Sequence, residues 1–596
     1  MNVKQRIVTL ISLLLIGICI IANAPMAMAS STATVAVLAT SDLHGNILNY
    51  DYLTGTTPTG SSTVGLAKIA TLVLQERSKY PCNILVDNGD FLQGTPLDAY
   101  YATVNTNWLV HPMVSVFNYM KYDAINIGNH EFNFGLDFLK KAAIHSEAQF
   151  LSANTRFVLT NTYLQHVKPY IIKHIDVSKI TGVEHDKLRI GIIGTVTPAI
   201  PNFESPANYQ GLNFIPQENA INMAIADLKR ENVDAIIVLS HSGVPSASSP
   251  YPENGIVAIA NKCTGINLIV SGHTHVLTDN THGVTDTSVS PSVSYPDGVI
   301  NGVPTMAPYR WGAYLSEALI TFEKTKGKWQ VRGVSTANLS TNGVADDPGV
   351  VSLAQPWDAA TKAYLATPLG KSTAPFPGKD GYKTYTALVD FVNKVQMYYG
   401  NADISAAASF NDTALIPQGT VTLQNVSSVY IYENYMFTIQ ITGKQLKQYL
   451  EKSASYFSQV ASGTPVDAAS LPYYTSSFYT APSYNYDMIS GVSYQINISK
   501  PVGSRIQNLT FKGKPVQDTD TFKFAINNYR YNGGGGFMSA MGLDALGKTG
   551  TVPTVLWDSQ KTMGDGGQVR NLIASYIKLQ GTITPNNSAN WNLVSK

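Results

Sequence analysis

The sequence predicts an α/β layered fold whose sheet is buried on both faces. Continuous valine and isoleucine runs, such as NILV and AIIVL, alternate with segments of helical periodicity such as GLAKIATLVLQERSKY. Acidic, amide and imidazole side chains follow the apolar runs at five places. Ligands of open α/β sheets bind in the crevice at the strand ends, so we expect these polar side chains to form one site.

Length and composition indicate a multidomain globular protein. A chain of 596 residues is too long for one hydrophobic core and should divide into two or more domains. Its 44% hydrophobic and 14% charged residues suit a folded protein, and its 33 tyrosines are typical of secreted proteins. A net charge of +1 and the lack of a basic block argue against a nucleic-acid duplex as partner.

The N-terminus has the pattern of a secretory signal. Lys4 and Arg6 precede an apolar run at residues 7–22, and Ala27 and Ala29 form a small-x-small cleavage pattern. We therefore expect residues 1–29 to be a signal peptide, with the mature chain exported to the periplasm, cell wall or medium and not inserted in a membrane. A transmembrane anchor is the alternative, because the run is close to the lower limit of about 17 residues for spanning a bilayer.

Two cysteines, Cys82 and Cys263, remain after the predicted cleavage. Both lie near the starts of predicted strands, where buried thiols are common. A disulfide between them stays an alternative, because sequence does not show whether they are close together. The lack of a CxxC motif argues against a cysteine-ligated metal.

The clearest candidate site begins at DLHGN, where Asp42 and His44 follow the apolar run VAVLA. Residues i and i+2 of a strand point to the same side, so both could reach one metal ion. A lone histidine at such a position is usually an ordinary polar residue, but five of the 11 histidines fall at strand ends. The candidate residues at the other ends are Asp90, Asn129, His130, His241, His273 and His275.

The motifs DLHGN, GDFLQGTP, GNHEF, SHSG and SGHTH, in this order, resemble the calcineurin-like metallophosphoesterases and, more narrowly, the secreted 5′-nucleotidase family. The resemblance implies an N-terminal four-layer α/β/β/α domain and a C-terminal α/β nucleoside-binding domain. It also implies two divalent metal ions, such as Zn, Mn or Co, bridged by one aspartate and one hydroxide that attacks phosphorus. The implied ligands of the first ion are Asp42, His44, Asp90 and His275, and those of the second are Asp90, Asn129, His241 and His273.

The same resemblance assigns His130 to the substrate phosphate, where an imidazolium would stabilise the charge that develops in the transition state. Related 5′-nucleotidases carry an aspartate three residues later, which orients this histidine. Here that position is Asn133, and the loss of the carboxylate removes a group that would raise the imidazole pKa. Asn133 is either an orienting residue or a plain polar loop residue.

The second half of the chain is different in kind. We expect a metallophosphoesterase domain over residues 30–344, a linker helix and hinge over 345–382, and a substrate-binding domain over 383–596. The linker contains the helical segment VVSLAQPWDAATKAYLA followed by the Pro/Gly-rich TPLGKSTAPFPGKDGY. Helical and strand patterns are mixed beyond it.

Two stretches of this half carry candidate substrate contacts, YIYENYMF and INNYRYNGGGGF. In the family, two aromatic residues from these places enclose a nucleobase, and a glycine-rich loop lets the backbone approach the ligand. Stacking of this kind is worth about 1–3 kcal/mol per base. The candidates are Tyr432, Asn434, Tyr529, Tyr531, Gly534 and Gly535.

Departures from the 5′-nucleotidase pattern indicate the substrate. The arginine of a family GGxR turn is replaced at Asn411, and a ribose-binding aspartate is replaced at Gly535. GNHEFNFG, SGHTH and NNYRYNGGGGF are closer to the 2′,3′-cyclic-nucleotide 2′-phosphodiesterase/3′-nucleotidase branch. We therefore expect a monomeric exported enzyme that opens ribonucleoside 2′,3′-cyclic phosphates and then removes the 3′-phosphate.

Two alternatives remain at this point. The first is a 5′-nucleotidase or nucleotide-sugar hydrolase. The second is a non-catalytic secreted protein that binds nucleotides or metal, but such a protein is expected to lack some ligands, and all seven positions are filled.

Overall fold

A computed structural model describes residues 32–596, except for 248, 382, 467–474, 477–478 and 481–482. The predicted signal peptide lies outside the described residues. Within the described part of the chain, none of the helices combines the length and apolar character that crossing a bilayer requires.

The first sheet of the N-terminal half has seven strands, and four of them, β1 to β4, run parallel. This arrangement places the carboxyl ends of β1, β2 and β3 at one edge, as the sequence pattern requires. The strand order is β18 (Lys328–Ser340), β17 (Tyr314–Thr325), β1 (Thr32–Thr40), β2 (Asn83–Asp87), β3 (Ala124–Asn126), β4 (Gln149–Leu151) and β6 (Val167–Lys168).

The second sheet contributes the remaining strand ends. Its strands β8, β10, β11 and β16 are parallel, with β7 and β12 antiparallel at the two edges. The order is β12 (Leu277–Thr278), β16 (Val303–Pro308), β11 (Leu268–Ser271), β10 (Ala235–His241), β8 (Lys187–Val196) and β7 (Tyr170–Asp176).

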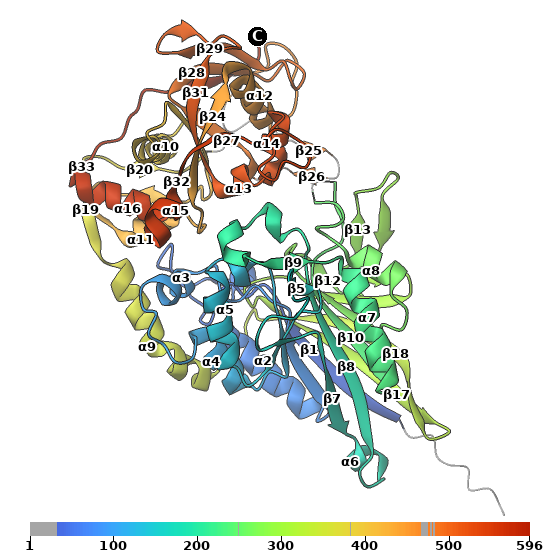
Figure 1. Ribbon diagram of the computed structural model, residues 1–596. Coiled ribbons are helices and arrows are strands. Elements are labelled where there is room, and N and C mark those ends of the chain that lie inside the picture. Colours follow the sequence, from blue (N-terminus) through green and yellow to red (C-terminus); the bar gives the residue numbers. More distant parts are fainter. Residues whose placement is uncertain (1–31, 248, 382, 467–474, 477–478, 481–482) are drawn as a thin grey trace, which may run out of the picture.

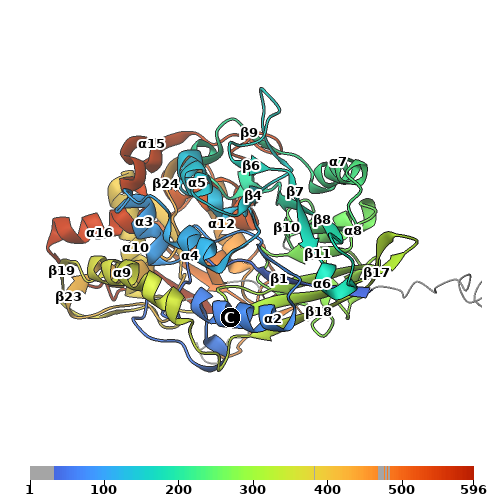
Figure 2. The same ribbon diagram turned by 90° about the horizontal axis from the view of Figure 1, so that it is seen from below.

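Strand alternation explains how the two sheets stack. On β10, Ile237 and Leu239 pack into a core between the sheets, whereas Ile236 and Val238 pack into a second core beneath helices. Helices α2 (Leu66–Lys79), α4 (Pro112–Met120) and α5 (Gly135–Ile144) cover the first sheet, and α7 (Gln217–Arg230) and α8 (Ile256–Lys262) cover the second. Figure 2 shows α4 and α5 on one side of the strands and α7 and α8 on the other. The expected four-layer α/β/β/α arrangement is confirmed.

The C-terminal half folds around a five-stranded sheet (Figure 1). Its order is β27 (Asp487–Ser490), β21 (Ile404–Ala408), β31 (Thr521–Asn527), β24 (Met436–Thr442) and β32 (Val555–Asp558). Helices α10 (Ala387–Gly400) and α12 (Gly443–Ala454) pack against this sheet, and β28 (Val492–Asn497) belongs to a separate four-stranded sheet. These elements match the strand and helix patterns of the sequence.

Helix α9 (Pro348–Leu365) lies within the predicted linker, and it packs against α2, α3 (Pro96–Thr103) and α4. Asp347 caps its first turn by accepting a hydrogen bond from Val350 N at 2.8 Å. The chain then enters β19 (Pro368–Ser372), which pairs with β23 (Gly419–Thr422) and β33 (Thr582–Ile583). The segment after α9 is therefore already part of a C-terminal sheet at Pro368.

Cys82 and Cys263 are both buried free thiols. Each Sγ lies 3.5 Å from a backbone carbonyl, that of Asp176 for Cys82 and that of Glu218 for Cys263. The preference for thiols over a disulfide is confirmed.

Candidate metal centre and nucleotide cleft

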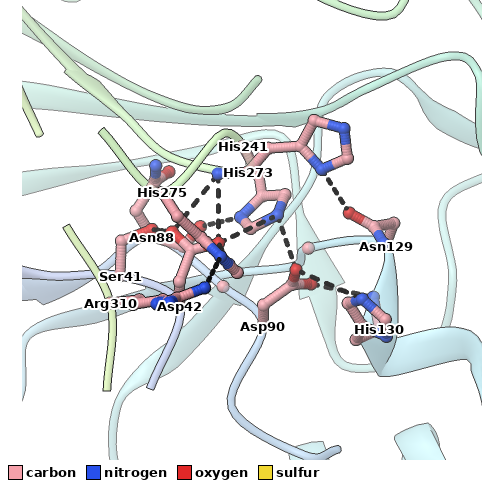
Figure 3. Close-up of polar contacts among 12 residues, drawn as sticks. Ser41, Asp42, Asn88, Asp90, Asn129, His130, His241, His273, His275 and Arg310 are labelled. Carbon is pink, nitrogen blue, oxygen red and sulfur yellow. Dashed lines mark hydrogen bonds and ion pairs between the residues drawn. The ribbon is translucent and has the colours of Figure 1, made fainter. Parts of the chain in front are cut away.

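The two sheets bring their polar strand ends to one place. All seven candidate metal ligands converge there, and Figure 3 shows the carboxylates of Asp42 and Asp90 directed toward the surrounding imidazoles. The contributing positions follow β1 (Asp42 and His44), β2 (Asp90), β3 (Asn129), β10 (His241) and β11 (His273 and His275).

The first group of potential ligands is Asp42, His44 and His275. His275 Nε2 lies 3.3 Å from Asp42 Oδ1 and 3.2 Å from His44 Nε2. Two imidazole nitrogens and a carboxylate oxygen thus face a common point, which is the arrangement that a divalent ion with nitrogen and oxygen ligands requires.

The second group is Asp90, His241 and His273. His241 Nε2 lies 2.9 Å from Asp90 Oδ2, and His273 Nδ1 lies 2.8 Å from the amide oxygen of Asn129. Asp90 also forms a potential ligand group with His44 and His130, so its carboxylate lies between the two sides of the site.

Backbone carbonyls set the tautomers of two of these histidines. His44 Nδ1 donates to Gln93 O at 2.8 Å, and His241 Nδ1 donates to Asn88 O at 2.8 Å. A neutral imidazole with its proton on Nδ1 has a lone pair on Nε2. Both Nε2 atoms are therefore suited to bind a metal ion.

The charges at the site require a cation. Asp42 and Asp90 are fully buried, and although burial opposes ionisation, the nearby histidines hold the pKa of each carboxyl below its usual range. Burial likewise disfavours a charged His241, but the two carboxylates raise its pKa to about 10. Two buried carboxylates that stay ionised attract positive charge strongly, which fits divalent cations as the natural occupants.

The backbone is strained at the same residues. Asp42, His44, Asp90, His273 and His275 all have positive φ angles, between 47° and 70°. Such values are uncommon for residues other than glycine and cluster at functional sites. Two glycines make the close packing feasible, since a Cβ at Gly128 would lie 2.2 Å from Asp90 Oδ1, and one at Gly272 would lie 2.8 Å from Asp42 Oδ2. The conformation thus favours ligand placement over local stability.

His130 lies at the rim of this centre, with its side chain 30% exposed and its Nε2 4.0 Å from Asp90 Oδ2. Its backbone N–H donates to Asp90 Oδ1 at 2.8 Å. Its Nδ1 contacts Asn133 Oδ1 at 2.6 Å, which gives Asn133 an orienting contact rather than a plain loop position. The amide of Asn133 donates in turn to the buried Glu204, a residue that the sequence patterns did not indicate.

The metal centre opens into a cleft of about 1820 Å³ between the two halves of the chain. The lining includes His130, His273 and His275 on one side and the candidate substrate residues Tyr432, Asn434, Tyr529, Gly534 and Gly535 on the other. Tyr531 lies elsewhere, because its ring stacks on Phe437 at 4.2 Å between centroids. We therefore leave Tyr531 out of the proposed substrate contacts.

An arginine absent from the sequence-based site also enters the cleft. Arg310 follows β16, its Nη1 lies 3.2 Å from His275 Nδ1, and its guanidinium stacks over Trp311 at 3.9 Å. Tyr309 and Trp311 on either side both have positive φ angles, 65° and 61°. The surrounding PYRWG has no spacing that would have indicated a phosphate contact, so only the fold reveals this position.

Comparison with known proteins agrees with this geometry. A model of the calcineurin-like phosphoesterase family matches residues 35–277, and a model of the 5′-nucleotidase C-terminal domain matches residues 368–541. The 2′,3′-cyclic-nucleotide 2′-phosphodiesterase/3′-nucleotidase of Salmonella typhimurium is 30% identical over 95% of this chain and 89% of its own length. The chain belongs to the 5′-nucleotidase family of calcineurin-like phosphoesterases.

Two further relatives of this 5′-nucleotidase-family chain differ in how much they share. The trifunctional nucleotide phosphoesterase protein of Bacillus subtilis is 31% identical over 94% of this chain, which spans only 39% of that longer protein. The structure of a 5′-nucleotidase precursor from Thermus thermophilus covers 94% of this chain and 100% of its own, with a TM-score of 0.60 at 19% identity. The latter likeness shows the shared fold.

Calcineurin-like phosphoesterases use two divalent metal ions, and the carboxylate and imidazole groups described above fit that requirement in this member of the 5′-nucleotidase family. The chain is therefore a metallophosphoesterase-type hydrolase.

Proposed function

We propose that this protein is an exported nucleotide phosphohydrolase that converts ribonucleoside 2′,3′-cyclic phosphates to 3′-nucleotides and then releases phosphate from the 3′-nucleotides. The observation that carries the proposal is one cleft with the candidate metal centre on one side and two tyrosines on the other. Relatives from Salmonella typhimurium, Yersinia enterocolitica and Haemophilus influenzae that carry this bifunctional name support the substrate class.

We assign one cation to Asp42, His44, Asp90 and His275 and the other to Asp90, Asn129, His241 and His273. Support comes from the two ligand groups on either side of Asp90. Divalent cations held there would act as Lewis acids toward the phosphate and activate water for attack. Asn129 supplies an uncharged oxygen, so it adds no negative charge that would weaken this pull on the phosphate.

The groups of the protein complete the phosphate site. His130 is placed to donate a hydrogen bond from Nε2 to a phosphoryl oxygen as negative charge builds up there. Arg310 adds a permanent positive charge beside His275 and takes the place of the arginine that the sequence lacks near Asn411. Both groups act on charge that is greater in the transition state than in the bound substrate.

Tyr432 and Tyr529 hold the nucleoside in this proposal. Phe410 packs edge-on against Tyr432 at 5.1 Å, and Tyr529 lies so close to Gly534 that a Cβ there would be 2.5 Å from its ring. These contacts fix both rings before a ligand arrives, which lowers the entropy cost of binding.

Alanine at Tyr432 or Tyr529 is expected to raise KM by about 5–100-fold, the range that corresponds to losing one stacked base. The effect on kcat should be smaller, since neither ring contacts the reacting phosphate. Steady-state kinetics with 3′-AMP measure both constants. Tyr398→Ala, at an exposed tyrosine of α10, is the matched control and should leave KM unchanged. An unchanged KM in both cleft variants would contradict the nucleoside assignment.

A panel of 2′,3′-cyclic AMP, 3′-AMP and 5′-AMP tests the proposed activity. We expect release of phosphate from 3′-AMP and conversion of the cyclic phosphate to exceed hydrolysis of 5′-AMP. Dominant 5′-AMP hydrolysis would favour a 5′-nucleotidase, which is the second candidate because relatives at 22–23% identity carry that name.

A further inference from the structure

Asn133 lies between the imidazole of His130 and a buried carboxylate. Asn133 Oδ1 is 2.6 Å from His130 Nδ1, and Asn133 Nδ2 donates to Glu204 Oε2 at 2.5 Å. Glu204 is 5% exposed and belongs to the segment between β8 and β9 (Leu212–Phe214), about 70 residues farther along the chain. The three side chains therefore form a continuous row from the cleft into the interior.

The second oxygen of Glu204 is already occupied. Its Oε1 accepts from Ser205 N at 2.5 Å and from Asn208 Nδ2 at 2.9 Å. An ionised carboxylate only accepts hydrogen bonds, so Oε2 must face the N–H₂ side of Asn133. The amide oxygen of Asn133 is then turned to His130, and His130 must carry a proton on Nδ1.

We propose that Glu204 is a positioning residue that fixes the amide orientation of Asn133 and thereby keeps the Nδ1 proton of His130 directed away from the substrate. Glu204 thus substitutes, one residue removed, for the aspartate that contacts the corresponding histidine directly in related 5′-nucleotidases. The role of His130 toward phosphate rests on the proposed function, whereas the hydrogen-bond order in the row does not.

The same segment is attached to the C-terminal half of the chain. Asn532 Nδ2 donates to Glu204 O at 2.9 Å, and Gln560 Nε2 donates to Asn208 Oδ1 at 3.2 Å. Ser205 also hydrogen-bonds Gln560. Asn532 lies three residues after Tyr529, so the support of His130 and the nucleoside side of the cleft share one set of contacts.

Glu204→Gln should reverse the row while preserving its shape. Ser205 N and Asn208 Nδ2 would hold Oε1 of the new glutamine, leaving its N–H₂ group facing Asn133. The Asn133 amide must then turn over, and His130 Nδ1 becomes an acceptor with its proton on Nε2. We expect kcat for 3′-AMP to fall at least about tenfold, as is typical when an outer partner of a functional histidine is lost, with KM changed less than about twofold.

A reciprocal exchange makes the test specific. Asn133→Asp alone places two carboxylates in contact and should also lower kcat. Asn133→Asp combined with Glu204→Gln restores a donor opposite an acceptor, and the new aspartate again accepts from His130 Nδ1. We expect the double variant to recover kcat to within about threefold of the original enzyme, whereas two independent structural losses would be additive or worse.

The ring itself provides a readout that is independent of turnover. Nitrogen NMR of ¹⁵N-histidine-labelled protein distinguishes the tautomers, with the His130 signals identified from their loss in His130→Gln. Burial raises the pKa of Glu204 to about 7, so the spectra belong at pH 8.5, where its carboxylate is charged. We expect the Nδ1–H form in the original and double variants and the Nε2–H form in Glu204→Gln.

Glu218→Gln is the matched control for a buried carboxylate, since Glu218 pairs with Lys262 and Tyr251 away from the cleft. It should change neither kcat nor the His130 signals. An unchanged tautomer in Glu204→Gln, or no recovery in the double variant, would overturn the positioning role. Correct tautomer shifts in a protein without nucleotidase activity would overturn the proposed function and leave the row intact.

Discussion

Asparagine at position 90 is expected to lower kcat/KM for 3′-AMP by more than about 100-fold and to remove at least one bound metal ion per chain. That factor is the upper end for losing merely an outer partner of a metal ligand, and Asp90 is proposed to serve both ions. The amide retains an oxygen that accepts from His130 N, so the local backbone contact survives. Its loss of charge leaves Asp42 as the remaining buried carboxylate of the two ligand groups.

Metal analysis by mass spectrometry and steady-state kinetics check this result together. Asp186→Asn is the matched control, because Asp186 pairs with Lys324 near the start of β8, away from the strand ends that hold the ligands. It should keep two ions per chain and normal turnover. Full metal content with normal turnover in Asp90→Asn would remove Asp90 from the centre.

Alanine at His130 is expected to lower kcat by about 10²–10³-fold while both metal ions stay bound. The reason is that His130 stabilises charge on the phosphate without being needed as a ligand, and its side chain is partly exposed to the cleft. Metal analysis on the same samples separates this effect from loss of ions.

His174→Ala, at an exposed histidine of β7, controls for the loss of an imidazole and should behave as the original protein. Loss of metal in His130→Ala would instead make His130 a ligand, in line with its place in a potential ligand group with His44 and Asp90. Unchanged kcat would remove it from the reaction.

Much of the metal centre could be predicted because it follows from strand direction. Asp42 and His44 end β1, and His241 ends β10, so the parallel pairing of buried strands alone brings such residues to one edge. The apolar runs that predicted the strands are the same ones that form the core between the two sheets. A local pattern was therefore sufficient to locate a site built from distant segments.

Residues on irregular segments could not be predicted in this way. Glu204 lies between two short 3₁₀ turns, Ile200–Asn202 and Pro206–Tyr209, and Arg310 lies on the loop after β16. Their positions depend on packing between segments that have no periodicity to reveal it. Tyr531 shows the reverse case, since its motif resembles a binding loop but its ring packs on Phe437.

The most direct test of the dimetal site is an anomalous difference map from crystals of the mature protein grown with Mn²⁺. We predict two peaks about 3.5–4 Å apart, one beside Asp42, His44 and His275 and one beside Asn129, His241 and His273, with Asp90 between them. A map without peaks among these residues, or with a single peak remote from Asp90, would contradict the dimetal account.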